Sequence, residues 1–200
     1  MSLIISVYNS SLVIDSLCDQ AVEKDVAVVG LYCDFHAQQE QTTTNMLGAM
    51  LKQLVSKRGI PKHIRKAFQE AEREFGGRGL QLPDMRDALK KTITSRPRLF
   101  ICIDALDECT PKHRLELIES LQQIVCVSQG TRVFLTGRSH IEGEVVGCFG
   151  EVLTIPLSPA HGDIMNYLEM RLKGDTDPNA MDDKLRADIK GIIPENISER

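Results

Sequence analysis

Asp104 directly follows the apolar run at residues 99–103, and two further acids, Asp107 and Glu108, lie just beyond it. Such a run is typical of a strand buried on both faces of a parallel sheet. Open parallel sheets bind ligands outside the carboxyl ends of their strands. There one acid can hold the water shell of a phosphate-bound magnesium ion, and another can orient or deprotonate an attacking water. The segment indicates a magnesium–nucleotide site, and the alternative is a buried strand ending in a solvated acidic turn that caps a helix.

A cation follows the next predicted strand of the chain. Arg138 comes after the buried-strand pattern at residues 131–136. Its planar guanidinium can meet a terminal phosphate, although a single arginine after a strand is more often a solvated surface residue. The two segments lie about thirty residues apart with one helical pattern between them, as adjacent parallel strands require. Together they favour one shared site.

Strand and helix patterns alternate along the sequence. Apolar runs predict strands, and helical spacing predicts helices. The strands are expected at residues 26–35, 98–104, 131–136 and 152–155, and the helices at 10–23, 42–57, 61–75, 82–92, 112–125, 160–173 and 181–192. This alternation predicts an α/β fold, a mainly parallel sheet with helices on both faces. A polar loop near residues 174–180 predicts the boundary between an α/β domain (11–173) and the start of a helical subdomain (174–200).

Composition leads to expectations about partners and location. The chain has 24 basic and 28 acidic side chains, a net charge of −4, and only 4% aromatic residues. Without a basic stripe or a stacking platform, we expect no nucleic-acid partner. No signal peptide is evident and no run approaches the ~20 apolar residues that cross a bilayer, so we expect no membrane partner and a cytoplasmic location. The six cysteines are expected to be reduced, buried thiols.

Several segments resemble one protein family. Residues 103–109, Ile-Asp-Ala-Leu-Asp-Glu-Cys, are similar to the Walker B segment of NACHT-type STAND NTPases. Residues 135–138, Leu-Thr-Gly-Arg, are similar to the sensor segment of those proteins. Residues 28–35 and 41–48 resemble the fungal NACHT and nephrocystin 3-like N-terminal group.

The resemblance implies a P-loop NTPase fold that acts as a nucleotide-dependent signalling switch. It implies ATP or GTP and Mg²⁺ as cofactors, with Asp104 contacting the metal ion. It further implies that Asp107 and Glu108 act around the hydrolytic water, and that Arg138 contacts the terminal phosphate. The implied partners are the nucleotide, if a phosphate loop is supplied, and other protein domains of a larger receptor, with an oligomer possible in the full-length family.

One part of the implied site has no counterpart in the sequence. A phosphate-binding loop needs glycines, a lysine and a Ser or Thr, but no Gly-Lys pair occurs in the 200 residues. In the family this loop precedes the helix resembled by residues 11–19. We therefore expect a fold incomplete at its N-terminus, truncated before that helix, with residues 1–10 in place of the loop and weak nucleotide binding.

Two questions stay open at the level of sequence. The loop is missing either by truncation or by degeneration, so the sequence does not decide whether the chain is an NTP hydrolase. The alternative function is a non-catalytic protein-interaction or scaffold module that retains the NTPase fold.

Overall fold

A computed structural model describes residues 3–6, 10–22, 26–56, 59–75, 79–156, 161–173 and 182–198. The chain divides into two compact units, residues 1–156 and 157–200. The polar loop in the sequence predicts the boundary near residues 174–180. The division lies earlier because α7 (His161–Lys173) packs against α8 (Asp183–Ser198).

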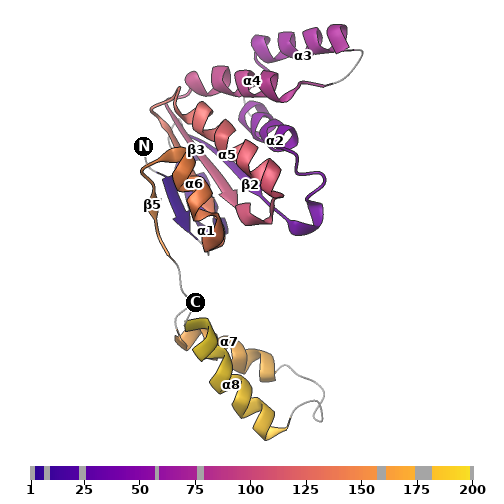
Figure 1. Ribbon diagram of the computed structural model, residues 1–200. Coiled ribbons are helices and arrows are strands. Elements are labelled where there is room, and N and C mark those ends of the chain that lie inside the picture. The colour runs from indigo at the N-terminus through magenta and orange to yellow at the C-terminus, as the bar shows by residue number, and fades with distance from the viewer. Residues whose placement is uncertain are drawn as a thin grey trace. The chain divides into compact units, whose positions relative to one another are not determined.

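The first unit is a five-stranded parallel sheet with helices on both faces (Figure 1). Its strands are β1 (Leu3–Ser6), β2 (Val26–Tyr32), β3 (Arg98–Asp104), β4 (Thr131–Thr136) and β5 (Leu153–Thr154). Its helices are α1 (Ser10–Val22), α2 (Thr43–Ser56), α3 (Lys62–Phe75), α4 (Leu82–Thr94), α5 (Pro111–Val125) and α6 (Glu142–Phe149), with short 3-10 turns η1 (Phe35–Ala37), η2 (Leu106–Glu108) and η3 (Ser139–Ile141). The strand order is β2-β3-β4-β1-β5 and every pairing is parallel. The predicted fold class is confirmed.

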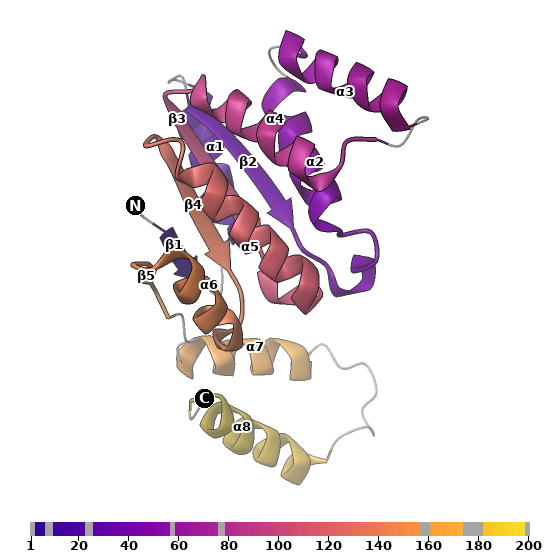
Figure 2. The ribbon, with the colours of Figure 1, turned by 45° about the horizontal axis from the view of Figure 1, so that its top comes forward.

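Each face of the sheet has its own core. Alternate side chains of a strand point to opposite faces, so Ile101 and Ile103 of β3 join the larger core beneath α2, α4 and α5. Cys102, between them, packs with Phe134 and with Ile14 of α1 on the other face. Figure 2 shows α2, α4 and α5 in front of the sheet and α1 behind it. This double cover explains why the strands are apolar on both faces.

Strand β1 is absent from the strands that the sequence predicts. It lies inside the sheet, with Ile5 paired to Leu135 of β4 on one side and to Thr154 of β5 on the other. Its four residues are too few to show a strand pattern. Only residues 7–9 separate β1 from α1. Part of the segment expected in place of the phosphate loop therefore forms an interior strand.

The second unit is a pair of helices. Ile164, Leu168 and Leu172 of α7 are buried, and their spacing of four residues places them on one face of the helix. The sequence predicts the second helix to residue 192, whereas α8 continues to Ser198 with Pro194 inside it. Within the described residues, no helix combines the length and the apolar character that crossing a membrane requires.

Candidate functional site

The ends of β3 and β4 are joined by a buried threonine. Thr136, the last residue of β4, donates its hydroxyl to Oδ1 of Asp104, the last residue of β3, at 2.5 Å. The hydroxyl oxygen of Thr136 also accepts the N–H of Ala105 at 2.8 Å. Ala105 has a φ of 53°, in the left-handed region that costs a non-glycine residue on the order of 1 kcal/mol. Thr136 therefore orients the first acid and holds the turn that follows it.

The turn leads directly into η2, which carries the other two acids. Leu106 is fully buried and anchors η2 in the larger core. Oδ1 of Asp107 accepts the N–H of Arg138 at 3.2 Å, and the Asp107 side chain is only 6% exposed. The Glu108 side chain is 25% exposed. Asp107 thus holds the segment after β4, while Glu108 remains more open to solvent.

Arg138 completes the group. Its Nε lies 3.4 Å from Oδ2 of Asp107, and its Nη2 lies 3.5 Å from Oε1 of Glu108. Its side chain is 72% exposed. Ion pairs this long and exposed contribute little, about 0–1 kcal/mol, so the guanidinium can leave them for a stronger anion. All four residues singled out in the sequence therefore meet at one edge of the sheet.

Gly137 makes this close approach possible. A Cβ at this position would lie 2.5 Å from Cδ1 of Ile141 and 3.2 Å from Oδ1 of Asp107. A larger residue would therefore require the Ile141 side chain to move and would crowd the Asp107 carboxylate. The sequence analysis noted Gly137 only as part of the resemblance, because close packing between distant segments leaves no local pattern.

A buried arginine of α5, Arg114, holds the end of the acidic segment at Cys109. Arg114 of α5 donates from Nη1 to the carbonyl of Cys109 at 3.1 Å. It also forms two contacts with Glu144 of α6, Nε to Oε2 at 2.6 Å and Nη2 to Oε1 at 2.7 Å. The hydrogen bond from Arg114 lowers the pKa of Glu144 below its usual value. Sequence reasoning missed this pair, because each residue looks like an ordinary charge on its own helix.

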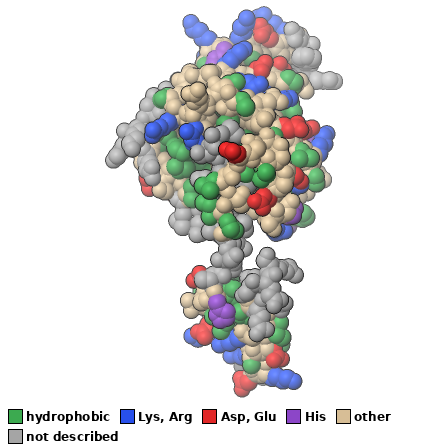
Figure 3. Space-filling view, turned by 60° about the vertical axis from the view of Figure 1, so that its left-hand side comes forward, with side chains coloured by type: hydrophobic (Ala, Val, Ile, Leu, Met, Phe, Trp, Pro, Cys, Tyr) green, Lys and Arg blue, Asp and Glu red, His purple; other side chains and the backbone are tan. Residues whose placement is uncertain are grey.

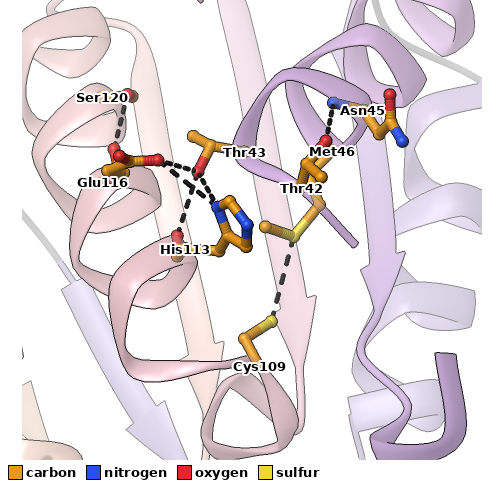
Figure 4. Close-up of polar contacts among 8 residues, drawn as sticks. All are labelled: Thr42, Thr43, Asn45, Met46, Cys109, His113, Glu116 and Ser120. Atoms are coloured by element: carbon orange, nitrogen blue, oxygen red, sulfur yellow. Dashed lines mark hydrogen bonds and ion pairs between the residues drawn. The ribbon is translucent and has the colours of Figure 1, made fainter. Parts of the chain in front are cut away.

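A second polar cluster joins α2 to α5 (Figure 4). The buried hydroxyl of Thr43 donates to Oε2 of Glu116 at 2.8 Å, and the Nδ1 atom of His113 lies 3.3 Å from the same hydroxyl. The hydrogen bond from Thr43 lowers the pKa of Glu116. Since the threonine hydroxyl is buried at a helix start, this cluster fixes α2 against α5.

The described residues fit one half of a magnesium–nucleotide site. Asp104 offers a single carboxylate, which suits a hydrated Mg²⁺ that takes its remaining ligands from phosphates and water. Within the described part of the chain, no group of three His, Cys, Asp or Glu side chains forms a closed metal cage. A phosphate loop joins a strand to a helix through about eight residues ending in Gly-Lys-Ser/Thr, whereas residues 7–9 alone join β1 to α1. The acidic half fits, and the described residues supply no phosphate loop.

The family model described as Nephrocystin 3, N-terminal matches residues 7–138. The chain belongs to this family. The match to the nephrocystin 3 N-terminal family ends at Arg138, so it includes all four residues of the candidate site. None of the curated proteins matches the chain.

Solved structures with this fold include Cdc6p from Pyrobaculum aerophilum, with a TM-score of 0.53 and 13% identity over 94% of this chain and 47% of that one. Drosophila ORC bound to DNA has a TM-score of 0.51 and 13% identity, over 86% of this chain and 41% of that one. The Aeropyrum pernix ORC1 protein in complex with DNA has a TM-score of 0.50 and 18% identity over 100% and 49%. This member of the nephrocystin 3 N-terminal family therefore shares the α/β fold of these proteins. It spans less than half the length of each of these proteins.

The expectation that nucleic acid is not a partner is wrong. Two of the structures with this fold contain DNA, so the fold and a net charge of −4 do not exclude such a partner. The expectation failed because total charge averages over the whole surface, whereas phosphates are contacted by a few local side chains and backbone N–H groups. On the face in Figure 3, basic and acidic side chains are interspersed. The net charge of the whole chain therefore does not describe the charge at any one place on the surface.

Proposed function

We propose that this chain carries the acidic half of the nucleotide site in a NACHT-type STAND signalling switch. The observation that supports this function is the meeting of Asp104, Asp107, Glu108 and Arg138 where β3 and β4 end. Acids and a mobile cation at this edge match the needs of phosphoryl transfer, which depends on positioning and electrostatic stabilisation. ATP or GTP with Mg²⁺ is the proposed ligand, and other domains of a larger receptor are the proposed protein partners.

Asp104 is the residue we assign to the metal ion. A bound Mg²⁺ supplies charge that stabilises the phosphate oxygens. The hydrogen bond from Thr136 occupies Oδ1 of Asp104, so Oδ2 would be the oxygen that holds the water shell of a bound ion. The fixed carboxylate thereby avoids reorienting when a metal ion arrives.

Glu108 is the better candidate for the acid that acts on water. Asp107 is nearly buried, and its Oδ1 accepts the N–H of Arg138. If Asp107 took a proton from the water, its hydrogen bond with the N–H of Arg138, which holds the loop after β4, would weaken. Glu108 is more exposed, and among the described residues its polar side-chain contact is the long one with Arg138. A proton acceptor needs a free oxygen within reach of the water, and the Glu108 side chain is 25% exposed and held by one long ion pair.

Arg138 is assigned to the terminal phosphate. A phosphate carries more charge than a single carboxylate, and the guanidinium fork binds it through two parallel hydrogen bonds. The exchange would release Glu108 from its ion pair at the moment when nucleotide binds. The site would therefore change its internal contacts on binding, as a switch requires.

Nucleotide titration followed by NMR tests this assignment. The ¹⁵N-labelled chain is titrated with Mg–ATP, with AMP as the ligand that lacks the terminal phosphates. Because no Gly-Lys loop is present, we expect weak binding, with a Kd on the order of 1 mM or above. We expect the chemical-shift changes to cluster at residues 104–109 and 136–139 and to be smaller with AMP than with Mg–ATP.

Two arginine variants make the test specific. Arg138→Gln should remove the shifts, whereas Arg132→Gln, an exposed arginine near the other end of β4, should leave them unchanged. Shifts absent from this edge would contradict the proposal. Micromolar binding, about −8 kcal/mol, would contradict the expected weakness and require another phosphate cradle.

A scaffold module that keeps the NTPase fold is the second candidate. The three-residue connection between β1 and α1 favours it, since the space for a phosphate loop is short. A scaffold has no reason to respond to the terminal phosphate. Equal responses to ATP and AMP, unchanged by Arg138→Gln, would favour this function over the switch.

A further inference from the structure

Two thiols lie against each other beside the acidic segment. Cys33 directly follows β2, Cys109 directly follows η2, and their sulfur atoms are 3.2 Å apart. Both cysteines are free. The N–H of Cys33 donates to the carbonyl of Asp104 at 3.0 Å, so the strand pairing extends to this point and holds the backbones in place. A disulfide bond is about 2.05 Å long, so side-chain rotation has to close a gap of roughly 1 Å.

The surroundings of Cys109 favour its thiolate. The hydrogen bond with Cys33 and the positive charge of Arg114 lower the pKa of Cys109, although burial opposes them. A thiolate is the form that reacts with oxidants. The Sδ atom of Met46 lies 3.9 Å from Sγ of Cys109 (Figure 4). Cys109 is buried and Cys33 is half-buried, so an oxidant would approach the pair from the side of Cys33.

We propose that Cys33 and Cys109 form a redox-modification site, in which hydrogen peroxide oxidises the two thiols to one intramolecular disulfide. The Cys109 thiolate attacks a peroxide oxygen and becomes a sulfenic acid as the O–O bond breaks, and the departing hydroxide takes up a proton to form water. The Cys33 sulfur then attacks the sulfenic sulfur, whose hydroxyl leaves as water with the Cys33 proton. Together the thiols lose two protons and two electrons, and the peroxide becomes two water molecules.

The disulfide would fix the acidic segment to the end of β2. Cys109 is adjacent to Glu108, whose carbonyl already accepts a hydrogen bond from Nε2 of Gln38 at 2.6 Å. The new bond would join positions 76 residues apart in the sequence. Closing so long a loop removes much freedom from the unfolded chain, so we expect the melting temperature to rise by about 5–15 °C. This effect does not depend on nucleotide.

Peptide mapping after oxidation tests the site. A Cys18→Ser/Cys126→Ser background removes two exposed thiols and leaves Cys33, Cys102, Cys109 and Cys148. The reduced protein is treated with hydrogen peroxide, alkylated, digested and analysed by mass spectrometry. We expect a linked peptide pair containing Cys33 and Cys109, the loss of two hydrogen atoms from the intact mass, and the rise in melting temperature, all reversed by dithiothreitol.

Single variants and the remaining thiols supply the controls. Cys33→Ser should abolish both the linked pair and the rise in melting temperature, whereas Cys148→Ser should preserve both. The proposal is overturned if Cys33 and Cys109 stay open to alkylation, or if peroxide links Cys102 or Cys148 instead. No nucleotide enters this experiment, so its failure leaves the nucleotide proposal untouched, and the reverse also holds.

Discussion

The hydroxyl of Thr136 lies between Oδ1 of Asp104 and the N–H of Ala105, and it bonds to both. One buried side chain thereby couples the ends of the two neighbouring strands β3 and β4. It fixes the carboxylate and supports a backbone turn with a positive φ at Ala105. The candidate site depends on this coupling, because the acids and Arg138 reach it from different strands.

Replacing Thr136 with valine should destabilise the fold. The variant keeps the shape of the side chain but leaves the N–H of Ala105 and Oδ1 of Asp104 without their partner. An unsatisfied buried polar group costs about 1–3 kcal/mol, and we expect a loss of this size in the free energy of unfolding measured with urea. Thr136→Ser keeps the hydroxyl and should lose less. A larger loss for Thr136→Ser than for Thr136→Val would mean that the methyl group, not the hydroxyl, matters.

Replacing Gly137 with alanine should disturb the loop after β4. The added Cβ would lie 2.5 Å from Cδ1 of Ile141 and 3.2 Å from Asp107. Overpacking of this kind costs about 1–3 kcal/mol, measurable by urea unfolding. Gly143 in α6 is the matched control, because its Cβ would meet nothing within 4 Å. Gly143→Ala should be neutral or stabilising by up to about 1 kcal/mol, since alanine favours a helix.

Acid should weaken the contact between Arg114 and Glu144. The pKa of Glu144 is lower in the folded chain than its usual value of about 4.3. The unfolded chain therefore takes up the proton first on acidification. The stabilisation is present above the unfolded pKa and is lost as the pH falls through the folded pKa.

Glu144→Gln isolates this contribution. At a pH of about 7 the variant should be less stable by about 1–3 kcal/mol, because Arg114 is buried and loses a charged partner. At a pH of about 3 the difference should shrink, since acid favours the unfolded chain, in which Glu144 takes up its proton more readily than in the folded chain. Urea unfolding of both chains at the two pH values measures this difference in the free energy of unfolding. A difference that stays constant with pH would rule out the ion pair as its cause.

The sequence predicts the elements that carry a strong local pattern. Strand β3 is a continuous apolar run, β4 is apolar at residues 133–135, and polar residues follow both, so the positions of the strands and the meeting of Asp107 with Arg138 follow from parallel topology. β1 is too short for a pattern, and α6 contains Gly143 and Gly147, which obscure its helical signal.

Contacts between distant segments are harder to predict. The pairing of Arg114 with Glu144 and the contact of Cys33 with Cys109 depend on how α5, α6 and β2 pack. Each residue alone has no unusual neighbours in the sequence. Their partners become evident only when the strands and helices are placed in space.

Substitutions at the adjacent acids Asp107 and Glu108 should differ in their effect on stability, because we expect Asp107 to hold the loop and Glu108 to act on the ligand. Asp107→Ala removes the nearly buried acceptor of the Arg138 N–H, and we expect a loss of about 1–2 kcal/mol in the free energy of unfolding. Glu108→Gln changes a more exposed side chain with one long contact, and the change should stay within about 0.5 kcal/mol. A small effect on stability would mean that Glu108 is not needed to hold the fold, which is consistent with a role toward the ligand. If Glu108→Gln proves as costly as Asp107→Ala, Glu108 holds the loop as well, and its assignment to the attacking water loses its structural basis.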